Sequence, residues 1–219
     1  MVDIKSIKSA IFDMDGTIMD SMWMWMNIEM DYLLSLGLQP RDDFMNIVYA
    51  SNQAEIARFY QDEYGIRKTF EEIAAGKDRL IEEFYFNRAT LKDGAISVLE
   101  ALKSSGIRMC LATATDRYLV EPALRRCGVY GYFERIFTCG EEETNKSMPD
   151  IFLRAAAFLG TEVEETLVVE DALYAIRSAK RAGFPVAAVY DATADRHQEA
   201  IKQLCDFYLP TIDKLLDFM

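Results

Sequence analysis

The chain alternates between short apolar runs and amphipathic stretches over most of its length. The apolar runs lie at residues 9–12, 107–112, 135–138, 166–169, 185–189 and 207–208. Runs of this length, bounded by turn residues, predict buried strands. Between them apolar residues recur with helical spacing, as at Ala95, Val98, Leu99 and Leu102. Strands that alternate with helices in this way predict an α/β core with a parallel sheet and right-handed crossovers.

Residues 20–87 break this alternation, because their pattern is helical and contains no clear strand. Thr69 and Glu72 have the spacing of a capping box at the start of one of these helices. We therefore predict a core formed by residues 1–19 and 88–219, with an all-helical unit inserted at residues 20–87.

The composition and net charge limit the kinds of molecule that this protein is expected to bind. The 219 residues are 51% hydrophobic, enough for a packed core, and the formal net charge is −12. This charge argues against nucleic acid or an anionic membrane as partner. No apolar stretch approaches the roughly 20 residues of a membrane span, no signal segment is visible, and the four cysteines lack a Cys-x-x-Cys spacing. We expect a cytoplasmic protein with reduced thiols.

The first apolar run ends in Asp13-Met14-Asp15-Gly16-Thr17. In an extended chain Asp13 and Asp15 point to the same side, where their charges repel unless a cation lies between them. Mg²⁺ is the natural candidate, since it prefers one or two carboxylates together with substrate phosphate oxygens. An EF-hand would need its glycine at the sixth position of the loop, whereas here it is the fourth. The alternative is an ordinary turn at the end of a strand.

Other polar residues follow the later strands, and ligands of open α/β sheets bind at the carboxyl ends of strands. A hydroxyl, an ammonium group and further carboxylates there would suit phosphoryl transfer at a divalent metal. Each residue also has a structural alternative, as a helix cap or a surface charge. The residues are Thr113 with Ala114, Lys146, Glu170 and Asp171.

Taken together, these motifs resemble those of the haloacid dehalogenase (HAD) superfamily, in particular its β-phosphoglucomutase and phosphoglycolate phosphatase-like branch. The resemblance spans residues 11–183 and implies a Rossmann-like core, a mobile helical cap and Mg²⁺. It implies that Asp13 is the nucleophile and that Asp15 is the acid and base, with its backbone carbonyl on the metal. Thr113 and Ala114 would bind phosphate, and Lys146 would neutralise charge. The metal residues would be Asp13, Asp15, Asp171 and Glu170.

The resemblance also favours one reaction. Asp15 argues against dehalogenation, and Trp25 stands where the mutases of this branch carry a histidine. We therefore predict a Mg²⁺-dependent phosphatase of a small phosphorylated metabolite, possibly a sugar phosphate, acting through an aspartyl-phosphate. The alternatives are a phosphosugar mutase and a non-catalytic regulatory protein. A phosphonate hydrolase would need a cap lysine, but Lys68 and Lys77 look like surface charges.

We expect residues of the helical insert to contact the substrate and to determine which substrate is bound. The sequence candidates are Trp23, Trp25, Ser51 and Asn52. Packing between helices is the structural alternative for the tryptophans. A cap that covers the site would allow a single chain to function, so we expect the protein to be a monomer.

Overall fold

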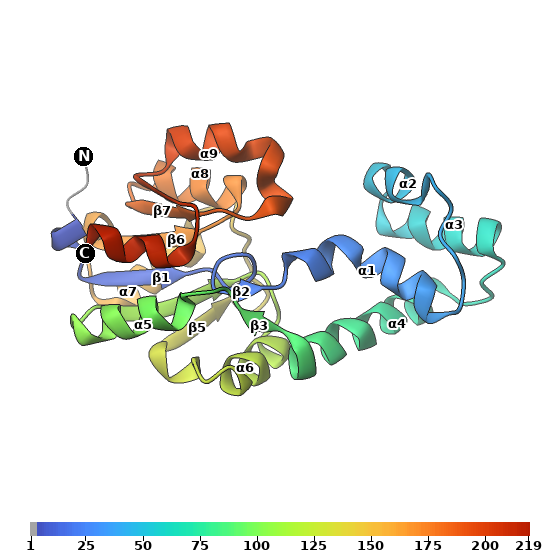
Figure 1. Cartoon of the computed structure of the whole chain (residues 1–219), viewed down its shortest axis with the longest axis horizontal. Coiled ribbons are helices and arrows are strands. Elements are labelled where there is room, and N and C mark those ends of the chain that lie inside the picture. Colours follow the sequence, from blue (N-terminus) through green and yellow to red (C-terminus); the bar gives the residue numbers. More distant parts are fainter. Residues whose placement is uncertain (1–3) are drawn as a thin grey trace. The chain divides into compact units, whose positions relative to one another are not determined.

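The computed structural model describes residues 4–219, and the chain forms two compact units. The first comprises Met1–Met22 and Ala89–Met219, and the second comprises Trp23–Arg88. Figure 1 shows the elements of both units. The sequence analysis predicted the boundaries between the two units at 19/20 and 87/88. Residues 1–3 of the predicted core lie outside the part of the chain that the structure describes. Within residues 4–219, no helix combines the length and apolarity needed to cross a membrane.

The first unit is built on a six-stranded sheet with strand order β5-β4-β1-β6-β7-β8. Every neighbouring pair is parallel, which confirms the predicted α/β core. Strand β1 therefore lies inside the sheet, between β4 and β6. The strands are β1 (Ser9–Phe12), β4 (Arg108–Thr113), β5 (Arg135–Thr138), β6 (Thr166–Glu170), β7 (Val186–Val189) and β8 (Phe207–Leu209).

Helices cover this sheet, so its central strands are buried over nearly their whole length. One core cluster joins Ile11 and Val168 of the sheet to Phe152, Ile176 and Ile201 of three helices. The helices are α5 (Ala95–Ser104), α6 (Arg117–Arg126), α7 (Asp150–Leu159), α8 (Leu173–Arg181) and α9 (Gln198–Leu204). Short 3-10 helices lie at Ile4–Ser6, Tyr130–Tyr132, Val163–Glu165, Ala192–His197 and Ile212–Phe218.

The two segments that connect the units pair with each other. Strand β2 (Met19–Asp20) runs antiparallel to β3 (Thr90–Leu91). Strand β2 was not expected, because residues 20–87 were predicted to contain no clear strand, whereas Asp20 belongs to β2. A two-residue strand has too few positions for an alternating pattern, so it leaves no signal in the sequence.

The second unit is all-helical, as predicted. Its core packs Tyr32, Phe44 and Tyr60 together. Thr69 and Glu72 form the expected capping box, and Asn52 and Glu55 form a second one at the start of α3. The helices are α1 (Met22–Ser35), α2 (Phe44–Ala50), α3 (Gln53–Tyr64) and α4 (Phe70–Glu83), followed by a π-helix at Phe84–Arg88.

Candidate active site

Asp13 is the first residue of the candidate site and lies at the carboxyl end of β1. Its backbone N–H donates to the carbonyl of Val169 in β6, 2.9 Å away, so the sheet fixes its position. The turn that follows requires glycine, because Gly16 has φ +85° and a Cβ there would lie 2.6 Å from Asp171 Oδ2. This close approach brings the first aspartate motif against the acidic residues that follow β6.

Lys146 contacts two of the predicted carboxylates. Its Nζ atom forms a buried ion pair with Asp13 Oδ1 and lies 2.8 Å from Glu170 Oε1. Burial alone would lower the pKa of Lys146, but the two carboxylates outweigh it and raise that pKa. The side chain therefore stays charged and is not the surface lysine that was its structural alternative.

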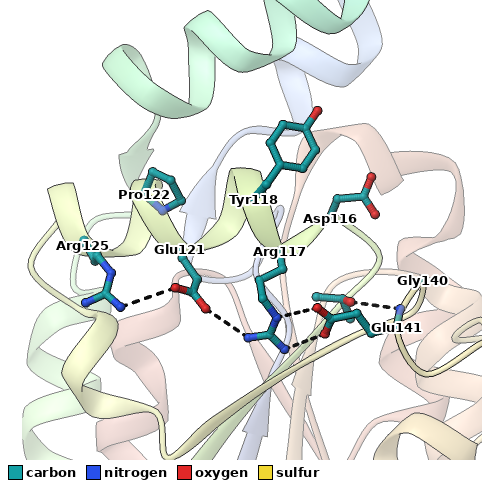
Figure 2. Close-up of a pocket in the computed structure, with 9 residues that line it drawn as sticks. Asp116, Arg117, Tyr118, Glu121, Pro122, Arg125, Gly140 and Glu141 are labelled. Atoms are coloured by element: carbon teal, nitrogen blue, oxygen red, sulfur yellow. Dashed lines mark hydrogen bonds and ion pairs between the residues drawn. The ribbon is translucent and has the colours of Figure 1, made fainter.

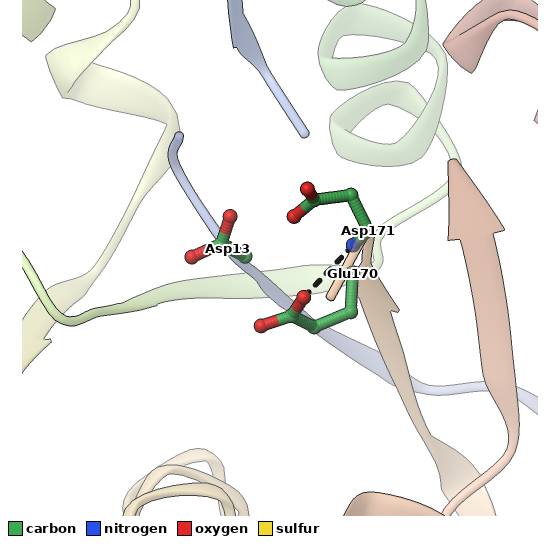
Figure 3. Close-up of side chains that lie close together, drawn as sticks. All are labelled: Asp13, Glu170 and Asp171. Atoms are coloured by element: carbon green, nitrogen blue, oxygen red, sulfur yellow. Dashed lines mark hydrogen bonds between the residues drawn. The ribbon is translucent and has the colours of Figure 1, made fainter. Parts of the chain in front are cut away.

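Asp13, Glu170 and Asp171 form a buried acidic cluster (Figure 3), with one oxygen from each within 4.8 Å of the others. Burial, opposed by Lys146 and aided by Glu170 and Asp15, raises the pKa of Asp13 to about 7. Burial and the charge of Glu170 also raise the pKa of Asp171 well above its usual range. Three carboxylates beside one ammonium group leave excess negative charge out of water, which is costly without a cation. The cluster therefore fits a hard divalent ion.

Glu170 also has a structural role. Its Oε2 accepts hydrogen bonds from the backbone N–H groups of Asp171 and Ala172, each 2.8 Å away, just before α8. These bonds close the turn that precedes α8 and do not cap the helix, since no side chain caps α8. Because its other oxygen accepts from Lys146, the orientation of the carboxylate is fixed on both sides.

Asp15 lies in a separate set of hydrogen bonds. Ser21 Oγ donates to Asp15 Oδ1 over 2.6 Å, and Thr115 Oγ1 donates to Asp15 Oδ2 over 2.7 Å. The N–H of Thr115 in turn donates to Thr113 Oγ1, 3.0 Å away. Thr113 is buried, whereas Ala114 between the two threonines is exposed. Neither Ser21 nor Thr115 was among the predicted site residues, although the Thr-x-Thr spacing at the end of β4 was a usable signal.

A hollow of about 810 Å³ lies next to the Thr113–Thr115 segment, and its walls come from α6 and the residues after β5 (Figure 2). Its arginines are already paired. Arg117 contacts Glu141 at 2.6 Å and Glu121 at 3.2 Å, and Arg125 contacts Glu121 at 3.4 Å. None of the predicted catalytic side chains lines it. The predicted catalytic residues therefore lie outside this hollow.

The residues predicted to select substrate all lie in the helical unit. Trp23 is half-exposed and packs edge-on against Phe84, with ring centres 5.3 Å apart. The Nε1–H of Trp25 donates to the hydroxyl of Tyr85 over 2.9 Å. Asn52 Oδ1 accepts from Ala54 and Glu55 as an N-cap, and Ser51 ends α2. The structure thus gives each of them a contact inside its own unit.

Lys77 was wrongly interpreted as a surface charge. It is buried between helices and forms an ion pair with Glu29 over 2.8 Å. Gln53 accepts from the same ammonium group, and Tyr60 donates to the other Glu29 oxygen over 2.8 Å. The sequence did not suggest this because Lys77 and Glu29 are 48 positions apart.

Comparison with known proteins identifies the family of this chain. The family model of the haloacid dehalogenase-like hydrolases matches residues 7–183. The protein SUPPRESSOR OF QUENCHING 1 of Arabidopsis thaliana is 28% identical over 85% of this chain, which spans only 18% of that relative. The (DL)-glycerol-3-phosphatase 1 of the same plant is 27% identical over 97% of this chain and 72% of its own length.

The solved structure of CbbY from Rhodobacter sphaeroides, in complex with phosphate, has a similar fold. It superposes with a TM-score of 0.72 at 22% identity, and covers 95% of this chain and 96% of the other. Because the family model matches most of the chain, this protein belongs to the haloacid dehalogenase-like hydrolases. The predicted family and the Rossmann-like fold with a helical cap are confirmed.

Proposed function

We propose that this protein removes the phosphoryl group of a small phosphorylated metabolite through an aspartyl-phosphate on Asp13, with Mg²⁺ as cofactor. The protein is a phosphoric monoester hydrolase of the HAD-like family. The observation that carries the proposal is the buried contact of Lys146 with Asp13, beside the cluster of Glu170 and Asp171. The similarity to a glycerol-3-phosphatase supports an alkyl phosphate as substrate.

The proposed metal residues are Asp13, Asp171 and Glu170, together with the backbone carbonyl of Asp15. The buried, negatively charged cluster fits Mg²⁺, which prefers carboxylate oxygens. Bound there, Mg²⁺ would offset the repulsion between the carboxylate and an incoming phosphate.

In the first step, an oxygen of Asp13 attacks phosphorus and the bond to the leaving oxygen breaks. Asp15 gives its proton to that oxygen. Lys146 offsets the charge that gathers on the phosphoryl group. Thr113, with the N–H of Ala114, holds the phosphoryl oxygens.

In the second step, Asp15 takes a proton from water, and the oxygen of that water attacks phosphorus. The bond to Asp13 then breaks and phosphate leaves, so Asp13 is again a carboxylate and Asp15 again carries a proton. The enzyme is thus returned to its starting state.

The helical unit is the proposed cap, and Trp23, Trp25, Ser51 and Asn52 are its candidate substrate contacts. Trp25 favours hydrolysis over mutase chemistry, because an indole cannot carry a proton between sugar hydroxyls as a histidine can. Its N–H donates to Tyr85, which holds the ring in place. A monomer in the cytoplasm is part of the same proposal.

The test is phosphate release from a panel of phosphorylated metabolites, with Mg²⁺ and with EDTA. Release that needs Mg²⁺ and disappears in Asp13→Asn supports the proposal, and the best substrate defines its class. A coupled assay for sugar-phosphate isomerisation runs beside it. Isomerisation without release would show a mutase instead, and inactivity on every substrate would favour the regulatory alternative.

A further inference from the structure

Two hydroxyl groups hold the carboxylate of Asp15. Ser21 Oγ lies 2.6 Å from one oxygen and Thr115 Oγ1 lies 2.7 Å from the other. Both residues are buried, with 0% and 8% of their surface exposed. Ser21 follows β2, and Thr115 follows β4. Two segments that are far apart in sequence thus fix the plane of a single carboxylate.

We propose that Thr115 and Ser21 are positioning residues, which aim the Asp15 carboxyl group for proton transfer to the leaving oxygen. This inference rests on the proposed function, in which Asp15 is the acid and base. A proton is transferred well only when the two heavy atoms come within about 2.6–3.2 Å. A carboxylate held at one oxygen can still rotate, whereas one held at both cannot.

Hydroxyl groups suit this task for a chemical reason. A hydroxyl group donates to a carboxyl oxygen without the positive charge of an ammonium group, so it does not hold Asp15 in the ionised form. When Asp15 is a carboxylate, both hydroxyls donate to it. When Asp15 carries its proton, each of its oxygens still has a lone pair that accepts from the same hydroxyl, so the proton stays available to the leaving oxygen. Asp15 therefore keeps two partners before and after each proton transfer, and its orientation survives the whole cycle.

Thr115 also connects the hydrogen bonds of Asp15 to the residue that is proposed to bind phosphate, Thr113. Its N–H donates to Thr113 Oγ1, the hydroxyl proposed to hold phosphate. The same residue thus fixes the proton donor and a phosphate ligand relative to each other. A shift of Thr115 would therefore misplace the acid with respect to the bond that breaks.

The test compares two leaving groups with the Mg²⁺-loaded enzyme. An alkyl phosphate, the best of the panel, needs a proton on its leaving oxygen, whereas 4-nitrophenyl phosphate releases a stable anion. For both, kcat/KM reports the steps up to phosphoryl transfer to Asp13. In Thr115→Val, kcat/KM should fall about 10–100-fold for the alkyl phosphate and less than about 3-fold for the aryl phosphate. Thr115→Ser should restore both.

Two further variants complete the experiment. Ser21→Ala should show the same leaving-group dependence, and it keeps the test available if Thr115→Val does not fold. Thr166→Val is the matched control, since Thr166 is a buried, hydrogen-bonded threonine at the start of β6. Its ratio of the two kcat/KM values should equal that of the unmodified enzyme.

Equal losses on both substrates, or no loss in either Thr115→Val or Ser21→Ala, would overturn the positioning role while leaving the phosphatase intact. If the unmodified enzyme hydrolyses neither substrate, the proposed function itself fails and the inference falls with it. The two failures are therefore distinguishable in one set of assays.

Discussion

Lys146 and Asp13 form a buried ion pair although 133 positions separate them in the sequence. Asp13 follows the inner strand β1, and Lys146 lies in the loop before α7. Since β1 and β6 pair in parallel, Glu170 at the end of β6 meets the same ammonium group. The ammonium group of Lys146 thus contacts carboxylates at the ends of two neighbouring strands. The balance between this one positive charge and the carboxylates is the basis of the first two predictions.

Asp13→Asn should stabilise the metal-free protein. Burial and neighbouring carboxylates raise the pKa of Asp13 to about 7 from an ordinary 3.8, so the folded state binds this proton more tightly than the unfolded state. Folding free energy is therefore lost as the pH rises from about 4 to 7. In EDTA, the variant should gain on the order of 1–3 kcal/mol near pH 8 and little near pH 4. Urea unfolding at several pH values measures this, and a pH-independent difference would contradict it.

Mg²⁺ should raise the unfolding temperature of the protein, because an ion that binds only the folded state stabilises it. At about 100 times its Kd the gain is about 2.7 kcal/mol. Asp171→Asn should remove most of this response, since it deletes one carboxylate of the cluster. Asp93→Asn, an exposed aspartate of the same unit, is the control and should keep it. An equal response in both variants would place the metal elsewhere.

The partly buried pair of Lys92 and Asp191 should contribute stability that depends on pH. Burial alone would raise the pKa of Asp191, but hydrogen bonds from Lys92 and Thr193 outweigh it and hold that pKa below its usual value. A lowered folded pKa gives stability above the unfolded pKa that is lost as the pH falls through the folded one. Asp191→Asn should therefore cost about 1–3 kcal/mol near pH 7 and progressively less below about pH 4. Unfolding by urea at both pH values tests the sign.

The Glu29–Lys77 pair predicts unequal effects of single and double changes in the helical unit. Both side chains are at most 10% exposed, so removing one partner leaves a buried charge. Lys77→Met should cost about 3–5 kcal/mol, whereas Lys77→Met with Glu29→Leu should recover much of that loss. A double-mutant cycle of unfolding free energies measures the coupling. Additive losses would mean that the two charges do not interact.

Much of the core, and which residues lie at the candidate site, could be predicted from the sequence. Each buried strand is a short apolar run, and Asp13, Thr113 and Glu170 come at or directly after strand ends, so a parallel sheet brings them to one edge. Helix-capping patterns were also predictive, as at Thr69. The two-residue strands β2 and β3 escaped detection because local pattern carries no information at that length.

The buried polar contacts could not be predicted, because a lysine or a serine has the same local pattern whether it is paired or solvated. Lys77 was misinterpreted for this reason, and the contacts of Thr115 and Ser21 with Asp15 were not predicted. Each depends on a partner from a distant segment.

The sequence by itself therefore determined the α/β core, the helical insert and the kinds of chemical groups at the strand ends, since hydrophobic periodicity and the succession of strands and helices along the chain are local properties. Only the tertiary structure decided which oxygen meets which donor. The pairing of Lys146 with both Asp13 and Glu170 and the two hydroxyls on Asp15 arise from side chains packed to within hydrogen-bond distance. Such distances depend on how whole strands and loops pack, and residue spacing alone does not encode them.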